Sequence, residues 1–244
     1  MNASDRLLPI SEIFSSPQGE GVWAGQMQTF IRLAGCTVGK PYDRKSLGLI
    51  AETLPIYTEQ CTLYDGRKFP CDTDYRVKER MSCFQIMEEI PKDVEHVCIT
   101  GGEPMMHNLD NLISYLLGEK KKIHIETSGT IYGYIDYDIW VTVSPKFNPY
   151  LAMLERANEV KILVDKDFNP AAPIMVLYED QVQAVSLVDI AKKKPVYLQP
   201  VNFENTVNKD NLQRCLEIQR DYPMFRVSVQ LHKVIGTTIG ELVR

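Results

Sequence analysis

Apolar residues cluster in short runs rich in valine, isoleucine and aromatic side chains, and turn-forming or charged residues bound each run. Runs of this length and composition are typical of β-strands. The pattern predicts strands at residues 27–33, 96–100, 122–127, 139–143, 159–164, 196–199 and 226–231.

Between several of these runs, apolar residues change to a helical spacing of i, i+3, i+4 and i+7. Residues 83–90 follow that spacing, and Ser82 with Gln85 forms a candidate capping box before them. Residues 109–116 repeat the pattern, and residues 212–219 follow it less regularly. We therefore expect helices in these three places.

The alternation of strands and helices predicts right-handed βαβ units and a parallel sheet. Ligands of such sheets bind at the carboxyl ends of the strands. Many of the predicted strands end in small residues, which allow close backbone approach, or in polar groups that can hold a ligand. These ends lie at residues 34–36, 101–104, 126–129, 144–146 and 199–200. The pattern indicates a large polar ligand at one edge of one sheet.

Composition narrows the function classes. The chain has 244 residues, 44% hydrophobic and 24% charged, which are values of a globular protein and allow a single domain. A net charge of -5 argues against nucleic-acid binding, which needs dense lysine and arginine. No signal peptide and no apolar run long enough to span a membrane is present, so we expect a cytoplasmic protein without a membrane partner.

The six cysteines fall into two groups. Cys83, Cys98 and Cys215 lie in apolar patterns, and Cys98 and Cys215 are predicted as core residues. Cys36, Cys61 and Cys71 lie in loop-like sequence without the close cysteine pairs of a structural zinc site. Three such thiolates suit a [4Fe-4S] cluster with one open iron, and unrelated loop thiols are the alternative.

A set of motifs, found in a fixed order along the chain, favours the iron–sulfur cluster over unrelated loop thiols. The chain contains EIFSSPQGEG at residues 12–21, FIRLAGC at 30–36, CDTDY at 71–75 and TGGEP at 100–104. IETSG at 125–129, SPK at 144–146, QP at 199–200 and QLHK at 230–233 follow in order. This set, over about residues 9 to 233, resembles the radical S-adenosylmethionine enzymes of the 7-carboxy-7-deazaguanine synthase family.

The resemblance implies an incomplete, TIM-like (β/α) barrel, formed by one radical S-adenosylmethionine domain over residues 1–244. It implies an enzyme of queuosine or related deazapurine biosynthesis. S-adenosylmethionine bound to the open iron would yield a 5'-deoxyadenosyl radical. That radical would convert 6-carboxy-5,6,7,8-tetrahydropterin to 7-carboxy-7-deazaguanine with loss of ammonia. The implied partners are this pterin, an electron donor such as a flavodoxin, and a second copy of the chain in a homodimer.

The resemblance also implies residue roles. The cluster ligands are Cys36, Cys61 and Cys71, and the Thr73 hydroxyl binds Mg²⁺, a hard ion that prefers oxygen. The residues that hold S-adenosylmethionine are Gly102, Ser144, Pro145, Lys146, Gln199, Pro200, Val201 and Asn202. The residues that contact the pterin are Pro17, Gln18, Gly19, Arg32 and Thr100.

One departure concerns cysteine spacing. The superfamily's usual motif is C-x3-C-x2-C, whereas both spacers here are long. Cys61 is chosen because it lies between Cys36 and Cys71, and Cys83 is its rival, although Cys83 lies on the apolar face of a predicted helix. Residues 37–70 are expected to form an inserted loop or short helix near the cluster.

Other interpretations remain open at this point. The chain can be an activase that installs glycyl radicals on a protein partner, or a binding module that lost its cluster. Glu126 is either a solvent-facing charge or an acceptor for the guanidine-like edge of the pterin. Lys161 is either a site cation or an exposed residue opposite Glu159, and His124 is predicted to be structural.

Overall fold

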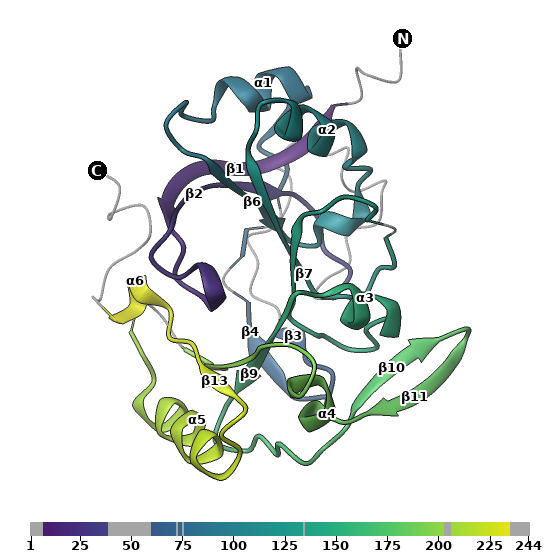
Figure 1. Cartoon of the computed structure of the whole chain (residues 1–244), viewed down its shortest axis with the longest axis vertical. Helices are drawn as coiled ribbons and strands as arrows, with labels where there is room; N and C mark the ends of the chain where they lie inside the picture. Colours follow the sequence, from purple (N-terminus) through teal and green to yellow (C-terminus); the bar gives the residue numbers. More distant parts are fainter. Residues whose placement is uncertain are drawn as a thin grey trace.

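The computed structural model of the chain describes residues 7–38, 60–71, 73–74, 76–133, 135–202 and 206–234. Its main sheet has nine strands in the order β13-β12-β9-β8-β7-β6-β2-β1-β5 (Figure 1). The strands from β2 to β13 pair in parallel, and β1 pairs antiparallel with β2 and β5. Because the sheet does not close on itself, the fold is an incomplete (β/α) barrel, as predicted.

The strands of the main sheet are β1 (Leu8–Pro17), β2 (Met27–Leu33), β5 (Glu79–Met81), β6 (His96–Gly101), β7 (Lys122–Thr127), β8 (Trp140–Val143), β9 (Glu159–Val164), β12 (Val196–Pro200) and β13 (Arg226–Val227). Two separate hairpins are β3 (Gln60–Thr62) with β4 (Lys68–Pro70), and β10 (Ile174–Tyr178) with β11 (Gln181–Val185).

The α-helices are α1 (Cys83–Glu88), α2 (Asp110–Gly118), α3 (Leu151–Arg156), α4 (Leu187–Ala191), α5 (Lys209–Asp221) and α6 (Leu231–Val234). Short 3-10 helices occupy Gly21–Trp23 and Pro104–Met106. Among the described residues, no helix has the length and apolar character needed to cross a membrane.

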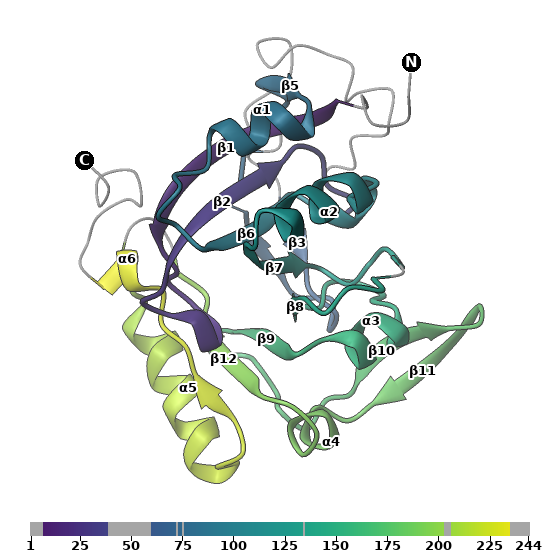
Figure 2. The same cartoon turned by 45° about the horizontal axis from the view of Figure 1, so that its top comes forward.

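The two faces of the sheet differ in chemistry. One face contributes side chains such as Ile99, Ile125 and Val160 to the main apolar core, where they pack with residues of the covering helices. The opposite face lines the lumen of the partial barrel, whose strands Figure 2 shows from a second direction. Polar residues on this face are register partners or near neighbours. Lumen positions include Thr100, His124, Glu126, Thr142, Glu159 and Lys161.

The connection between β1 and β2, residues 18–26, closes the lumen at the amino-terminal ends of the strands. The Trp23 ring lies 4.9 Å from that of His96 and 5.4 Å from that of Trp140. The Val22 amide donates to the Glu159 carboxylate at 3.0 Å. His96, Trp140 and Glu159 are the first residues of β6, β8 and β9. The 18–26 loop therefore packs against the starts of three parallel strands.

Six of the seven predicted strands are confirmed as β2, β6, β7, β8, β9 and β12. Their observed bounds differ from the predicted ones by at most one residue. The capping box is confirmed as well, because Ser82 accepts from the Gln85 amide and the Gln85 side chain accepts from the Ser82 amide. The helices expected near 109–116 and 212–219 are present as α2 and α5.

The strand predicted at residues 226–231 is wrong beyond Val227. Only Arg226 and Val227 pair, at the edge of the sheet with β12, and a helical turn begins at Leu231. The Gln230 side chain donates to Glu20 at 2.6 Å, so this segment leaves the sheet to contact the 18–26 loop.

We predict that replacing Gly21 by alanine destabilises the protein. The Gly21 φ of 66° is in the left-handed region, and a Cβ there would overlap the Glu159 carboxylate. Gly25 has a φ of 88° with nothing within 4 Å of a Cβ, so it is a matched control. We expect Gly25→Ala to lower the free energy of unfolding by about 1–2 kcal/mol. Gly21→Ala should lower it by a further ~1–3 kcal/mol because of the overlap.

Urea denaturation of the two variants measures this difference. Equal losses in Gly21→Ala and Gly25→Ala would show that the contact between the loop and Glu159 does not constrain Gly21.

Candidate functional site

The carboxylate of Glu126, near the end of β7, gathers lumen side chains from three other elements. Gln18 Nε2 donates to Glu126 Oε1 at 3.1 Å, and Thr100 Oγ1 donates to Glu126 Oε2 at 3.5 Å. Lys161 Nζ lies 3.8 Å from the same carboxylate. Two predicted pterin contacts, Gln18 and Thr100, are therefore brought together at Glu126.

Glu20 forms the second half of this polar group. Its carboxylate is paired with Lys161 and accepts from Gln199 Nε2 at 3.0 Å and from Gln230 Nε2 at 2.6 Å. Burial acts to raise the pKa of Glu20, but the charge of Lys161 and these hydrogen bonds lower it below its usual value. Glu20 is therefore an ionised, half-buried group at the base of the lumen.

Lys161 is the cation between the two carboxylates. It is 9% exposed, so it is not an exposed residue on the sheet. Burial opposes its charged form, but Glu126 and Glu20 together raise its pKa above the usual value. The sequence alone did not decide whether Lys161 is a site cation or an exposed residue. It indicated no role for Glu20 or Gln230. Their positions inside the QGEG and QLHK motifs were the available signal.

The glycine-rich end of β6 lies very close to the end of β2, its parallel neighbour. Gly101 has a φ of 130°, and a Cβ there would overlap the backbone of Leu33. Gly102 N donates to Leu33 O at 3.1 Å, and Glu103 N donates to Gly35 O at 2.9 Å. The TGGEP segment thus lies directly beside the chain that leads to Cys36.

Glu103, another residue without a predicted role, joins the ends of β6 and β7. Its carboxylate is 0% exposed and accepts from Thr127 Oγ1 at 2.6 Å and from the Ser128 amide at 2.8 Å. It also accepts from the Ser128 hydroxyl and from the Met105 amide. This buried carboxylate holds the two strand ends in register.

The SPK segment continues the same edge at the end of β8. The Ser144 amide donates to Thr127 O at 2.8 Å, and Pro145 is buried. Lys146 Nζ donates to Ser144 O at 3.0 Å and to Ser144 Oγ at 2.8 Å. Burial lowers the pKa of Lys146, although nearby cysteines counteract that effect.

Cys36, Cys61 and Cys71 come together beside Lys146. Cys36 and Cys71 share a small apolar cluster, and the Cys61 thiol interacts electrostatically with Lys146, Cys71 and Cys36. Burial raises the pKa of Cys61 to about 12. Cys83, by contrast, packs in the main apolar core.

Cys61 reaches this place on the β3–β4 hairpin, which lies within the segment expected as an insertion. The described part of that segment contains a hairpin instead of the expected loop or short helix, and residues 39–59 lie outside the described residues. Leu63 forms a β-bridge with Lys146, and the Phe147 amide donates to Thr62 O at 3.2 Å. The hairpin is thus joined to the end of β8.

Arg67 attaches the hairpin to the end of β9. Its guanidinium pairs with Asp165, donates to Leu163 O at 3.2 Å and lies 5.1 Å from the centre of the Phe168 ring. It also pairs with Asp65 within the hairpin at 2.7 Å. Arg67 therefore connects the segment that contains Cys61 to the barrel.

The remaining predicted residues lie at both ends of the barrel, with Pro17 and Gly19 at the amino-terminal ends of the parallel strands. Arg32 is the register partner of Thr100, lies 3.5 Å from Glu12 and is half-buried over the Phe14 ring. Thr73 is half-buried two residues after Cys71. Among the predicted pterin contacts, Pro17 ends β1 and Gly19 O accepts from the Leu231 amide. Among the predicted S-adenosylmethionine contacts, Pro200 ends β12 and Val201 N donates to Val164 O. Asn202 Nδ2 donates to Gln230 Oε1.

The prediction that Cys98 and Cys215 are buried core residues is confirmed. Cys215 packs in the main apolar core. Cys98 is 0% exposed, but it belongs to neither apolar cluster and faces the lumen beside His124 and Glu126. His124 is buried and hydrogen-bonded to Thr142, which agrees with a structural residue.

A partial (β/α) barrel with polar groups and three cysteines at one rim defines an α/β-barrel enzyme. No family model matches the chain. It is 32% identical over 235 residues to 7-carboxy-7-deazaguanine synthase of Synechocystis sp., covering 93% of this chain and 92% of the relative. It is 30% identical to the Escherichia coli K12 enzyme of that name, over 93% and 98% of the two chains.

The crystal structure of QueE from Escherichia coli superposes with a TM-score of 0.61 and 27% identity, over 93% of this chain and 95% of that one. The chain belongs to the 7-carboxy-7-deazaguanine synthase family.

We predict that Arg67→Ala releases the β3–β4 hairpin from the barrel. Amide hydrogen exchange across residues 60–70 should rise about tenfold or more, because opening of the hairpin no longer has to break the half-buried ion pair between Arg67 and Asp165 and its packing. Lys68→Ala, which alters an exposed neighbour, is the control. Equal exchange in both variants would contradict the role of Arg67.

Proposed function

We propose that this protein is a radical S-adenosylmethionine carbon–nitrogen lyase. It converts 6-carboxy-5,6,7,8-tetrahydropterin to 7-carboxy-7-deazaguanine with loss of ammonia, in queuosine or other deazapurine biosynthesis. The observation that supports this most is the approach of Cys36, Cys61 and Cys71 to one another beside Lys146. The shared name of the relatives supports the same reaction.

The three thiols suit an iron–sulfur cluster in number, chemistry and surroundings. Thiolates are the soft ligands that such clusters require, and burial makes a free Cys61 thiolate costly unless iron neutralises it. Lys146 adds a positive charge next to these sulfurs. When bound, the [4Fe-4S] cluster and S-adenosylmethionine supply the 5'-deoxyadenosyl radical that abstracts hydrogen from the pterin.

S-adenosylmethionine would lie along the strand ends next to these cysteines. Gly102 leaves space for the methionyl group because it has no side chain. Ser144, Pro145 and Lys146 would line one side of the cofactor. The opposite side would consist of Gln199, Pro200, Val201 and Asn202, of which Gln199 and Asn202 are already held by Glu20 and Gln230.

The pterin would lie in the lumen against the 18–26 loop. Pro17, Gln18 and Gly19 would frame the ring, and the Arg32 guanidinium would pair with the substrate carboxylate. Thr100 and Glu126 lie at the same level, where the carboxylate can accept from the guanidine-like edge. Thr73 would hold Mg²⁺ through its hydroxyl, near the end of β2.

We further propose the partners that the resemblance implies. A flavodoxin-type electron donor would reduce the cluster, and two copies of the chain would form a homodimer. The location is proposed to be cytoplasmic.

Anaerobic turnover tests the proposed function. Iron-loaded protein, given S-adenosylmethionine, Mg²⁺, a reductant and the carboxytetrahydropterin, should form 7-carboxy-7-deazaguanine and ammonia, detected by mass spectrometry. Cleavage of S-adenosylmethionine without this product would favour the glycyl-radical activase. Protein that stays colourless and binds no iron after reconstitution would favour the binding module without a cluster.

A cysteine series tests the cluster ligands. Cys36→Ala, Cys61→Ala and Cys71→Ala should each abolish iron retention after gel filtration, because three thiolates are needed. Cys83→Ala is the matched control and should retain iron, since Cys83 packs in the apolar core. Iron retained by Cys61→Ala and lost by Cys83→Ala would reverse the assignment.

A further inference from the structure

A continuous line of hydrogen bonds joins the residues proposed to hold S-adenosylmethionine to those proposed to contact the pterin. Asn202 Nδ2 donates to Gln230 Oε1 at 3.2 Å, and Gln230 Nε2 donates to Glu20 Oε1 at 2.6 Å. The Glu20 backbone amide donates to Gln18 Oε1 at 3.2 Å, and Gln18 Nε2 donates to Glu126 Oε1 at 3.1 Å. The side chain of Gln230 is therefore the link between the two subsites.

Gln230 can fill this place in one orientation only. Its nitrogen faces the Glu20 carboxylate and its oxygen faces the Asn202 amide nitrogen. A half-turn of the amide would place oxygen against oxygen at Glu20 and nitrogen against nitrogen at Asn202. The Asn202 amide is fixed as well, because its Oδ1 accepts from the Asn208 backbone amide at 2.8 Å. A displacement of Asn202 therefore removes the hydrogen bond that orients Gln230 toward Glu20.

The segment that carries Gln230 is held to the 18–26 loop by hydrogen bonds. The two segments lie side by side in both views (Figures 1 and 2). The Gly21 amide donates to Ser228 Oγ at 3.0 Å, and the Leu231 amide donates to Gly19 O at 3.3 Å. Leu231 is 41% exposed and belongs to neither apolar cluster. A segment with few buried apolar contacts has low local stability, so a bound ligand can change how fully it is ordered.

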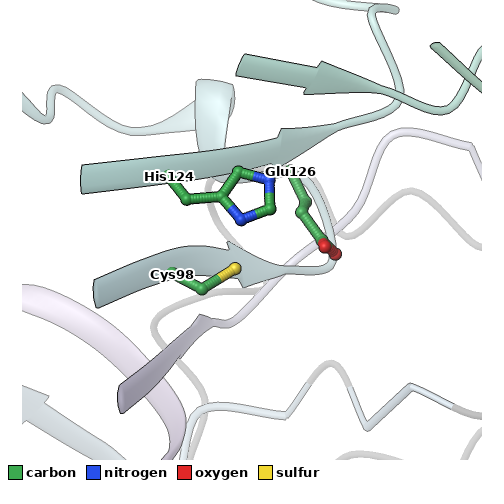
Figure 3. Close-up of side chains that lie close together, drawn as sticks. All are labelled: Cys98, His124 and Glu126. Atoms are coloured by element: carbon green, nitrogen blue, oxygen red, sulfur yellow. The ribbon is translucent and has the colours of Figure 1, made fainter. Parts of the chain in front are cut away.

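The other end of the line lies in the proposed pterin subsite. Glu126 extends from the same face of β7 as His124, toward the lumen (Figure 3). A pterin held by Gln18 and Glu126 would stabilise the 18–26 loop in its observed position. S-adenosylmethionine held by Asn202 would stabilise the segment with Gln230. Each ligand then orders contacts that the other ligand also requires, which produces positive cooperativity.

We propose that Gln230 is a positioning residue that couples the binding of S-adenosylmethionine to the binding of the pterin. The inference rests on the proposed function, because both ligands are taken from it. Gln230 acts through Asn202 and Glu20 and does not itself hold either ligand. Coupling between two binding sites is reciprocal, so each ligand should raise the affinity for the other by the same factor, about fivefold or more.

Equilibrium binding to the anaerobic, iron-loaded protein tests the coupling, without reductant so that neither ligand reacts. The dissociation constant of S-adenosylmethionine is measured with and without saturating 6-carboxy-5,6,7,8-tetrahydropterin, and that of the pterin with and without S-adenosylmethionine. Independent affinities in the wild-type protein would overturn the proposal, and turnover by the same preparation would leave the proposed function standing. Protein that binds no pterin would contradict both.

A variant tests the role of Gln230. Gln230→Met keeps the length of the side chain and removes both hydrogen bonds, so the coupling factor should fall to near unity while each ligand alone still binds. Gln213→Met, which alters an exposed glutamine of α5, is the matched control and should keep the coupling. Weaker binding of both ligands with an unchanged coupling factor would show a merely structural role and would overturn the proposal.

Amide hydrogen exchange gives a second measurement that needs no variant. S-adenosylmethionine alone should slow exchange in residues 18–26, because the line of hydrogen bonds extends from Asn202 to that loop. Exchange in this loop that S-adenosylmethionine leaves unchanged would overturn the proposal even if Gln230→Met failed to fold.

Discussion

The buried ammonium of Lys161 is the interaction on which the lumen depends. It extends from β9 to Glu20 of the 18–26 loop and to Glu126 of β7. Burying charges costs several kcal/mol per ion, and loss of one partner leaves the others uncompensated. The loop can therefore close the barrel only while Lys161 is paired. The positions of Gln18, Gln199 and Gln230 follow, because all three donate to these two carboxylates.

The cysteines at the rim of the barrel are positioned by the docking of the β3–β4 hairpin. Three cysteines that are far apart in sequence meet there because a hairpin docks across the ends of β8 and β9. The entropic cost of closing a loop grows slowly with its length, so a long insertion between two of them is tolerated. What the insertion needs is a firm attachment, and Arg67 with Asp165 and Phe168 supplies one.

Local patterns were sufficient for much of the fold. The strands of the parallel sheet and the Ser82 capping box depend on neighbouring residues, and the structure confirms them. The sequence did not indicate β1 or the β10–β11 hairpin, and it extended β13 too far. Cys98 was predicted as a core residue because it lies in an apolar run, where a free cysteine packs as a small hydrophobe, and it is fully buried. That run did not show that Cys98 faces the lumen beside His124.

The amino-acid sequence by itself determined the class of fold, the family motifs and the residue types available for chemistry, since these depend on local spacing and order. Only the tertiary structure decided that Cys61 approaches Cys36 and Cys71 while Cys83 packs in the core. It also decided that Glu20 and Glu126 both pair with the buried Lys161 in the lumen. Such pairings join residues separated by up to 141 positions, and no local periodicity encodes which distant side chains meet.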